Sequence, residues 1–322
     1  MRAITVERQG GPEVLSVTDI DAPRPGTGEL LVRVAAAGVN FRDIYVREGV
    51  GVYDQPTPFV PGDEGAGTVL AIGPGVTDFA PGDTVAWCDA PGSYAEQTIV
   101  PASRAVPVPH GVDLKVAASV MVQGLTAHYL CHSAFPVAEG NICVVHAAAG
   151  GVGLQLTQQV KKRGGIVVAT VSTSAKAALA QQAGADHVTT YDEFTEAVRR
   201  VSAERGADVV FDGVGKDTFD DSLASLRPRG MMVLYGGASG QVPPFDLQRL
   251  NTGGSLFITR PTLVSYVADR GELLWRAGDL FEWIAKGELD VRIGAEYPLD
   301  GAARAQEDLA ARRTTGKLVL IP

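Results

Sequence analysis

Apolar residues in positions 1–120 occur in short runs separated by turns rich in glycine and proline. The turn sequences PGTGE, GPGV and PGD carry residue types that reverse the direction of the chain. The apolar runs have the length and composition of β-strands, and they are LLVRVAAAGV (30–39), AGTVLAIG (66–73), DTVAWC (83–88) and AEQTIV (95–100). This pattern predicts a compact β domain shaped as a partly closed barrel.

From Val116 onward, strand-length apolar runs alternate with helix-length periodic segments. The predicted strands are ICVVH (142–146), IVVATV (166–171), HVTT (187–190), DVVFD (208–212), MMVLYG (231–236) and LFIT (256–259). The predicted helices are 154–164, 175–183, 192–205 and 217–226. Because strands that alternate with helices pair in parallel, the pattern predicts a doubly wound parallel sheet with helices on both faces.

A chain of 322 residues is long for a single core, so two domains are expected. After Pro261 comes a long amphipathic segment (272–289), and the final run KLVLIP (317–322) is expected to return to the first domain. The sequence therefore predicts an α/β protein. One domain comprises residues 1–122 and 263–322, and a Rossmann domain comprises residues 123–262.

Composition narrows the classes of function. Hydrophobic residues make up 45% of the chain, charged residues 20%, and the net charge is −9. That balance is typical of globular proteins, and it lacks the basic face of a nucleic-acid binder. Three scattered cysteines, an amino terminus without an apolar leader and the lack of any run of ~20 apolar residues predict a cytoplasmic protein without membrane insertion.

The sequence HAAAGGVG (146–153) joins an apolar strand to a helix. Ala147, Gly150 and Gly153 follow the A-x-x-G-x-x-G spacing, in which glycines let a pyrophosphate approach the backbone amides at a helix N-terminus. Such a loop can also be a tight structural turn. Its place inside a repeating strand–helix pattern favours dinucleotide binding, with contacts expected at Ala149, Gly150, Gly151, Val152 and Gly153.

The end of the next strand bears on the choice between NAD and NADP. NAD sites usually carry an acidic residue there for the ribose hydroxyls. Here the segment TVSTSAK (170–176) offers Ser172, Lys176 and no carboxylate, which suits a 2′-phosphate. The other interpretation is that Lys176 lies on a solvated helix face. The sequence favours NADPH.

Five stretches in this order resemble the medium-chain dehydrogenase/reductase superfamily, and they are GVNFRD (38–43), PGDEGAG (61–67), GPGVTDFAPGDTV (73–85), AAAGGVG (147–153) and TTGKLVLIP (314–322). In the zinc alcohol dehydrogenases of that superfamily the first stretch carries a cysteine and the second a histidine. This chain has Asn40 and Asp63 there, so no metal site is expected. His128 and His132 are spaced like a ligand pair but lack the motif of a metalloprotease.

Within the superfamily the chain resembles the zinc-free quinone oxidoreductases of the zeta-crystallin type, through GVNFRDIYVREG, HAAAGGVGL, DGVGKDTFDDSL and FITRPTL. The resemblance implies a GroES-like β-barrel catalytic domain, a Rossmann domain, a homodimer, and hydride transfer from NADPH to quinones. Enones or 2-alkenals are alternative acceptors on the same scaffold. A non-catalytic nucleotide- or RNA-binding role is a further alternative, which the acidic balance disfavours.

The resemblance also implies site residues. Those expected near the reacting groups are Asn40, Asp43, Tyr45 and Tyr53. Those expected to hold the cofactor, besides the glycine loop, are Asn40, Thr126, Ser172, Lys176, Tyr191, Tyr235, Gly236, Gly237, Thr259, Arg260 and Lys317. Relatives often carry lysine where this chain has Gln123. Structural alternatives remain open for four of them: Asn40 as a turn cap, Asp43 as an orienting group, Tyr53 as loop packing and Arg260 in an ion pair.

Overall fold

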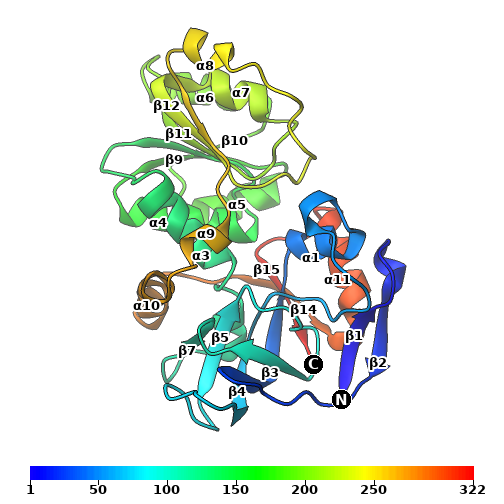
Figure 1. Ribbon diagram of the computed structural model, residues 1–322. Coiled ribbons are helices and arrows are strands. Elements are labelled where there is room, and N and C mark those ends of the chain that lie inside the picture. Colours follow the sequence, from blue (N-terminus) through cyan, green and yellow to red (C-terminus); the bar gives the residue numbers. More distant parts are fainter. The chain divides into compact units, whose positions relative to one another are not determined.

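The computed structural model describes residues 1–322, which form two compact units (Figure 1). The first unit comprises Met1–Val122 and Val267–Pro322, and the second comprises Gln123–Tyr266. The sequence placed the second boundary after residue 262, ahead of helix α9 (Leu263–Tyr266). This helix lies in the second unit because the Tyr266 ring stacks on Tyr129 with centroids 4.2 Å apart.

The first unit is built on a seven-stranded sheet in the order β14-β15-β3-β4-β5-β7, with β6 paired to β3. All pairs are antiparallel except β14 with β15. The strands are β3 (Glu29–Val39), β4 (Glu64–Ile72), β5 (Thr84–Cys88), β6 (Gln97–Pro101), β7 (Ala105–Pro107), β14 (Ile293–Pro298) and β15 (Lys317–Ile321), and β1 (Arg2–Val6) with β2 (Leu15–Asp19) forms a separate ribbon. The predicted β domain and the return of the final strand are confirmed.

The expected turn after β3 is a helix, α1 (Phe41–Glu48), so an all-β first segment is wrong at this point. Asn40 precedes the helix in an extended conformation, and its backbone N–H donates to the Asp43 carboxylate at 2.8 Å. Gly49 ends the helix in the left-handed region, at φ 66°. A polar residue at the N-cap, a carboxylate three residues later and a closing glycine stabilise this short helix. Its apolar residues show too little periodicity to predict it.

The remaining helices of the first unit include two with acidic N-caps, Asp113 before α2 and Asp269 before α10. They are α2 (Leu114–Ala118), α10 (Arg270–Ala285), α11 (Ala302–Ala310), and the 3-10 turns η1 (Pro12–Val14), η2 (Gly51–Tyr53) and η4 (Leu299–Gly301). Helix α10 starts and ends a few residues before the predicted segment 272–289 because Asp269 caps its first turn through the Glu272 amide.

The second unit has a six-stranded sheet in the order β10-β9-β8-β11-β12-β13, with every pair parallel. Numbered along this unit the order is 3-2-1-4-5-6, which is that of the Rossmann fold. The strands are β8 (Ile142–Val145), β9 (Ile166–Thr170), β10 (His187–Thr189), β11 (Ala207–Asp212), β12 (Leu226–Leu234) and β13 (Phe257–Thr259). Strand β12 begins earlier than predicted, through the segment Arg-Pro-Arg at 227–229.

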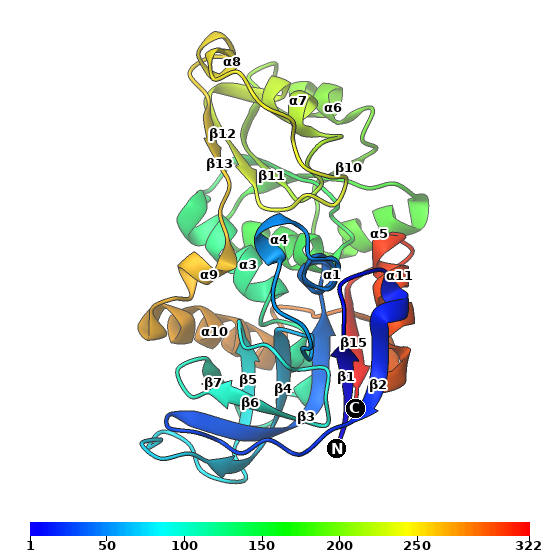
Figure 2. The ribbon, with the colours of Figure 1, turned by 45° about the vertical axis from the view of Figure 1, so that its right-hand side comes forward.

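Two cores cover the two faces of this sheet. Helices lie on both of its sides (Figure 2). Val145 and Phe211 pack on one side, whereas Val144 and Val210 pack on the other, as alternation along a strand requires. The helices are α3 (Gln123–Tyr129), running into the π-helical segment η3 (Leu130–Ala134), then α4 (Gly151–Lys162), α5 (Ser174–Gln182), α6 (Phe194–Val201), α7 (Phe219–Ala224) and α8 (Gln248–Thr252). The predicted doubly wound sheet is confirmed. No helix combines the length and the apolar character that a membrane crossing demands.

Candidate active site

Asn40 lies where β3 meets α1, and its side chain points into the first unit. Its amide N–H donates to Glu64 Oε2 at 2.9 Å, and its Oδ1 accepts from the Lys317 ammonium at 2.8 Å. Lys317 also pairs directly with Glu64, and neither side chain is exposed to solvent. The other Glu64 oxygen accepts from the Val122 N–H at 2.6 Å. Asn40 occupies the N-cap position of α1, which was the structural alternative named for it, and its side chain also belongs to a buried polar network.

The pair of Lys317 and Glu64 fits only because Gly38 has no side chain. A Cβ at this position would lie 2.2 Å from Glu64 Oε2 and 2.7 Å from the Lys317 side chain. The sequence missed Glu64 as a functional residue, although it follows Asp63 in a quoted motif. Lys317 was expected to contact the cofactor. The structure places its ammonium against a carboxylate and an amide instead, so a cofactor contact stays a prediction.

Asp43 lies on the buried face of α1. Its carboxylate accepts from the Asn40 N–H and from the Tyr94 hydroxyl, the latter at 2.9 Å. Burial, reinforced by the neighbouring Asp63 charge, raises the pKa of Asp43 to about 7 despite these bonds. The arrangement supports the orienting role given as the alternative for Asp43. Tyr94, which the sequence did not single out, is fully buried above it.

Four alternating charges extend from the first turn of α1. Arg42 Nη1 lies 2.8 Å from Asp63 Oδ2 and 3.4 Å from Asp89 Oδ1, and Arg104 Nη2 lies 3.2 Å from Asp89 Oδ2. Arg104 also donates to the Val267 carbonyl at 2.7 Å. The Asp63 oxygen makes no well-aligned hydrogen bond, so its approach to Arg42 is an ion pair. Burial raises the pKa of Asp63, and Arg42 opposes that shift.

Tyr45 and Tyr53, both expected near the reacting groups, contact each other. Their ring centroids are 5.5 Å apart, which joins α1 to the turn η2. Phe41 lies on the same side of α1, with its centroid 6.4 Å from that of Tyr45. Both tyrosines are half-buried. This contact shows that Tyr53 packs on the helix, and a role towards a substrate stays a prediction.

The glycine loop of the second unit begins at Ala147, which has φ 52°, and continues into α4. A Cβ on Gly153 would lie 2.4 Å from the Ala147 carbonyl oxygen, a backbone atom that has no freedom to withdraw. A Cβ on Gly151 would overlap the Gln123 amide. The Tyr191 hydroxyl accepts from the Ala147 N–H at 3.2 Å. The loop thus has the close helix–strand approach that a pyrophosphate site needs.

Thr173, which stands between Ser172 and Lys176, caps helix α5 by accepting from the Lys176 N–H at 3.3 Å. The Lys176 ammonium donates to Ser172 Oγ at 3.4 Å. Ser172 is exposed, and no carboxylate follows strand β9 before the helix. These groups fit a 2′-phosphate, since they offer hydroxyl donors and an ammonium on one side of a helix N-terminus.

Other predicted cofactor residues lie at strand ends or on α3. Tyr235, Gly236 and Gly237 directly follow β12, and a Cβ on Gly236 would lie 2.5 Å from the Gly213 carbonyl oxygen. Thr259 ends β13, and Thr126 is buried on α3. Arg260 is exposed and bonds only a neighbouring carbonyl, so the ion-pair interpretation for it is wrong.

A buried network that the sequence did not predict lies beneath the loop. His146 is inaccessible to solvent, with Nδ1 2.8 Å from Thr170 Oγ1 and Nε2 2.9 Å from Ser222 Oγ. Ser222 donates to Asp212, whose other oxygen accepts the Val214 and Gly215 amides. Burial lowers the pKa of His146, so the imidazole is neutral. The network joins the ends of β8, β9 and β11.

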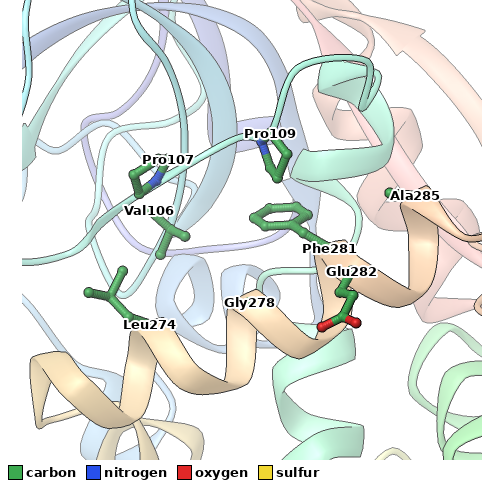
Figure 3. A pocket seen from close by; sticks show the side chains of 8 residues that line it. All are labelled: Val106, Pro107, Pro109, Leu274, Gly278, Phe281, Glu282 and Ala285. Carbon is green, nitrogen blue, oxygen red and sulfur yellow. The ribbon is translucent and has the colours of Figure 1, made fainter.

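Two further observations concern metal ligands and cavities. No group of three or more His, Cys, Asp or Glu side chains is placed to hold a metal ion. An apolar groove in the first unit lies between α10 and the segment 106–109, and none of the candidate site residues lines it (Figure 3). Its one charged residue, Glu282, is paired with Lys286.

Comparison with known proteins covers the whole chain. Residues 26–110 match the family described as alcohol dehydrogenase GroES-like domain, and residues 151–267 match zinc-binding dehydrogenase. The chain is 43% identical to a quinone oxidoreductase of Pseudomonas aeruginosa, covering 97% of each. It is 39% identical to a 2-haloacrylate reductase of a Burkholderia species, covering 99% of this chain and 98% of that one.

Solved structures show the same similarity. A mycobacterial protein complexed with NADPH is 48% identical, with a TM-score of 0.96 and complete coverage of both chains. The Escherichia coli quinone oxidoreductase complexed with NADPH is 37% identical, also with a TM-score of 0.96 and complete coverage.

Proposed function

The chain belongs to the zeta-crystallin-type quinone oxidoreductases of the medium-chain dehydrogenase/reductase superfamily, and on that premise we propose that it reduces quinones with hydride from NADPH. It is an NADPH-dependent oxidoreductase, as the sequence predicted. One observation carries the cofactor assignment in this chain's own residues. A glycine loop without room for a Cβ at Gly153 is followed by a strand end with Ser172 and Lys176 and no carboxylate.

Different parts of the second unit are proposed to hold different parts of NADPH. The loop amides from Ala149 to Gly153 take the pyrophosphate, and Ser172 with Lys176 takes the 2′-phosphate. Strand-end residues Tyr235, Gly236, Gly237, Thr259 and Arg260, with Thr126 and Tyr191, are proposed to line the remainder. When bound, NADPH supplies the hydride. The protein binds and orients NADPH and excludes water from the site.

The acceptor is proposed to lie on the first unit near Asn40, Tyr45 and Tyr53. Asn40 and Asp43 serve as positioning residues there, because the buried network already binds their side chains. The relative that reduces 2-haloacrylates supports the second candidate activity, which is reduction of enones or 2-alkenals at the same site.

A substrate panel tests the function. Purified protein is expected to oxidise NADPH with 1,4-benzoquinone or 1,4-naphthoquinone and to yield the hydroquinone. Failure with every quinone, combined with turnover of 2-cyclohexenone or a 2-alkenal, would favour the second candidate. Failure with all acceptors would overturn both.

The cofactor assignment is tested with Lys176→Ala. Losing an ammonium that pairs with phosphate is expected to weaken NADPH binding roughly tenfold or more while leaving NADH binding nearly unchanged. Fluorescence titration of both nucleotides measures this. Lys162→Ala, on the neighbouring helix α4, is the matched control. Equal effects on the two nucleotides would remove the 2′-phosphate assignment.

The homodimer and the cytoplasmic location that the sequence suggested are retained as proposals. Strand β13 is an unpaired sheet edge, and Phe257 on it is 55% exposed, which supports pairing with a second copy. Light scattering of the wild type and of Phe257→Asp tests this, since a monomeric wild type would exclude the dimer. All three cysteines are buried and none forms a disulfide, which is compatible with a reducing compartment.

A further inference from the structure

Helix α1 presents two different faces. Asp43, Ile44 and Arg47 are buried, whereas Phe41, Arg42 and Tyr45 are only partly covered. The Phe41 and Tyr45 rings, four residues apart, have centroids 6.4 Å apart, and Arg42 projects from the same short helix. The Tyr53 ring extends this aromatic pair from η2. Partly exposed rings and an ordered cation on one short helix match a flat molecule that carries oxygen atoms.

The Arg42 guanidinium is held in place from one side only. Its Nη1 contacts both Asp63 and Asp89, while Nε and Nη2 make no hydrogen bond within the protein and the side chain is 42% exposed. Asp89 is fixed in turn by Arg104 and by a backbone in the left-handed region, at φ 57°. An arginine ordered in this way loses little conformational freedom when its free donors bind a ligand.

We propose that Arg42 binds the carbonyl oxygen of the acceptor through Nε and Nη2. The inference rests on the proposed function and names a residue for it. Hydride brings two electrons to the quinone, the electron pair of the attacked π system shifts to the carbonyl oxygen, and a proton from solvent completes the hydroquinone as NADP⁺ forms. The guanidinium donates to that oxygen as its negative charge develops. Since arginine keeps its proton at all working pH values, it remains a donor throughout.

The charges around Arg42 indicate a neutral acceptor. Arg42 and Arg104 contribute two positive charges, and Asp63 and Asp89 contribute two negative ones, so the formal sum is zero. Such a cluster does not attract anions over long distances. It can still stabilise a negative charge that appears on an oxygen in direct contact. Acceptors that become charged only during reaction therefore fit better than carboxylates.

Arg42→Met and Arg42→Lys test this, with Arg33→Met as a control that removes an equal charge from the exposed side of β3. Arg42→Met is expected to lower kcat/KM for 1,4-naphthoquinone roughly ten- to a hundred-fold, because charge-assisted hydrogen bonds to the reacting oxygen are lost. The Kd of NADPH is expected to stay within about twofold. Arg42→Lys keeps the positive charge but not the planar set of guanidinium donors, so an intermediate loss of kcat/KM is expected.

Calorimetric titration of naphthoquinone into protein without NADPH gives a second readout, with weaker binding expected for Arg42→Met. A sulfonated naphthoquinone is compared with the neutral one. Loss confined to the sulfonated compound would mean that Arg42 binds an anionic substituent, which overturns the proposal, as would unchanged kinetics in Arg42→Met. If Arg42→Met does not fold, Arg42→Lys decides by the same criteria. A wild type inactive with all quinones would remove the proposed function and this inference together, whereas an active wild type with unaffected variants removes only the inference.

Discussion

At the scale of single residues, the site in the first unit depends on groups that are buried rather than exposed to solvent. Asn40 uses its amide to join Glu64 and Lys317, and Asp43 accepts from Asn40 and Tyr94. Every member of this network lies at or below 9% exposure. Their common effect is to fix the start of α1, from which Arg42 and Tyr45 project. Changes in this network therefore act on stability first and on chemistry through position.

The titration of Asp43 gives a pH dependence with a definite sign. Its pKa is raised from 3.8 to about 7, so the folded state holds a proton that the unfolded state has released. As far as Asp43 is concerned, the free energy of unfolding is therefore greatest below pH 4. It decreases as the pH rises to 7 and beyond, by up to about 4 kcal/mol. Urea unfolding of Asp43→Asn at several pH values is expected to lack this decrease. Asp78→Asn, an exposed carboxyl, is the control and should keep the wild-type slope.

The pair of Lys317 and Glu64 is expected to show strong coupling. Lys317→Met leaves a buried carboxylate without its cation and should cost about 3–5 kcal/mol. Adding Glu64→Gln removes that charge and should restore part of the loss. Chemical denaturation of the two single variants and the double variant measures the interaction. Additive effects would contradict a direct pairing.

At the scale of elements, the tight approach of α4 to β8 is expected to control nucleotide binding. Gly153→Ala places a methyl 2.4 Å from the Ala147 carbonyl oxygen, which must shift the loop and is expected to weaken NADPH binding at least about tenfold. Gly150→Ala meets the same oxygen at 3.1 Å, so a smaller loss is expected. Nucleotide titration compares them. Equal affinities in both variants would contradict the packing argument.

Much of the element pattern could be predicted from the sequence, and the exceptions have physical causes. Strands of the second unit were found because parallel strands buried on both faces read as apolar runs. Helix α1 was missed because its eight residues are mixed in polarity, although Asn40, Asp43 and Gly49 mark its ends. Glu64 and Lys317 are 253 positions apart, and only the pairing of β15 with β3 brings them together. Local patterns carry no signal for such a contact.

At the scale of the whole molecule, the two units have separate cores, and the cofactor residues proposed from the loop and the strand ends belong to one of them. NADPH is therefore expected to stabilise the second unit. A ligand at about a hundred times its Kd adds about 2.7 kcal/mol to the unit that binds it. Differential scanning calorimetry should show a higher Tm with NADPH than with equimolar NADH. Equal shifts for the two nucleotides would contradict the preference for the 2′-phosphate.

The separation of Lys317 from its partners also has a consequence in time. All of β3, α1 and Glu64 are synthesised before the second unit, and Lys317 follows 253 residues after Glu64. At about 5–20 residues per second, the ribosome needs roughly 10 to 50 seconds to reach it. The Glu64 carboxylate lacks its cation throughout that interval, whereas the last strand of the Rossmann sheet, β13, is complete before Lys317 is made. The nucleotide domain can thus mature on the ribosome first, and the acceptor site is completed only when the last strand arrives.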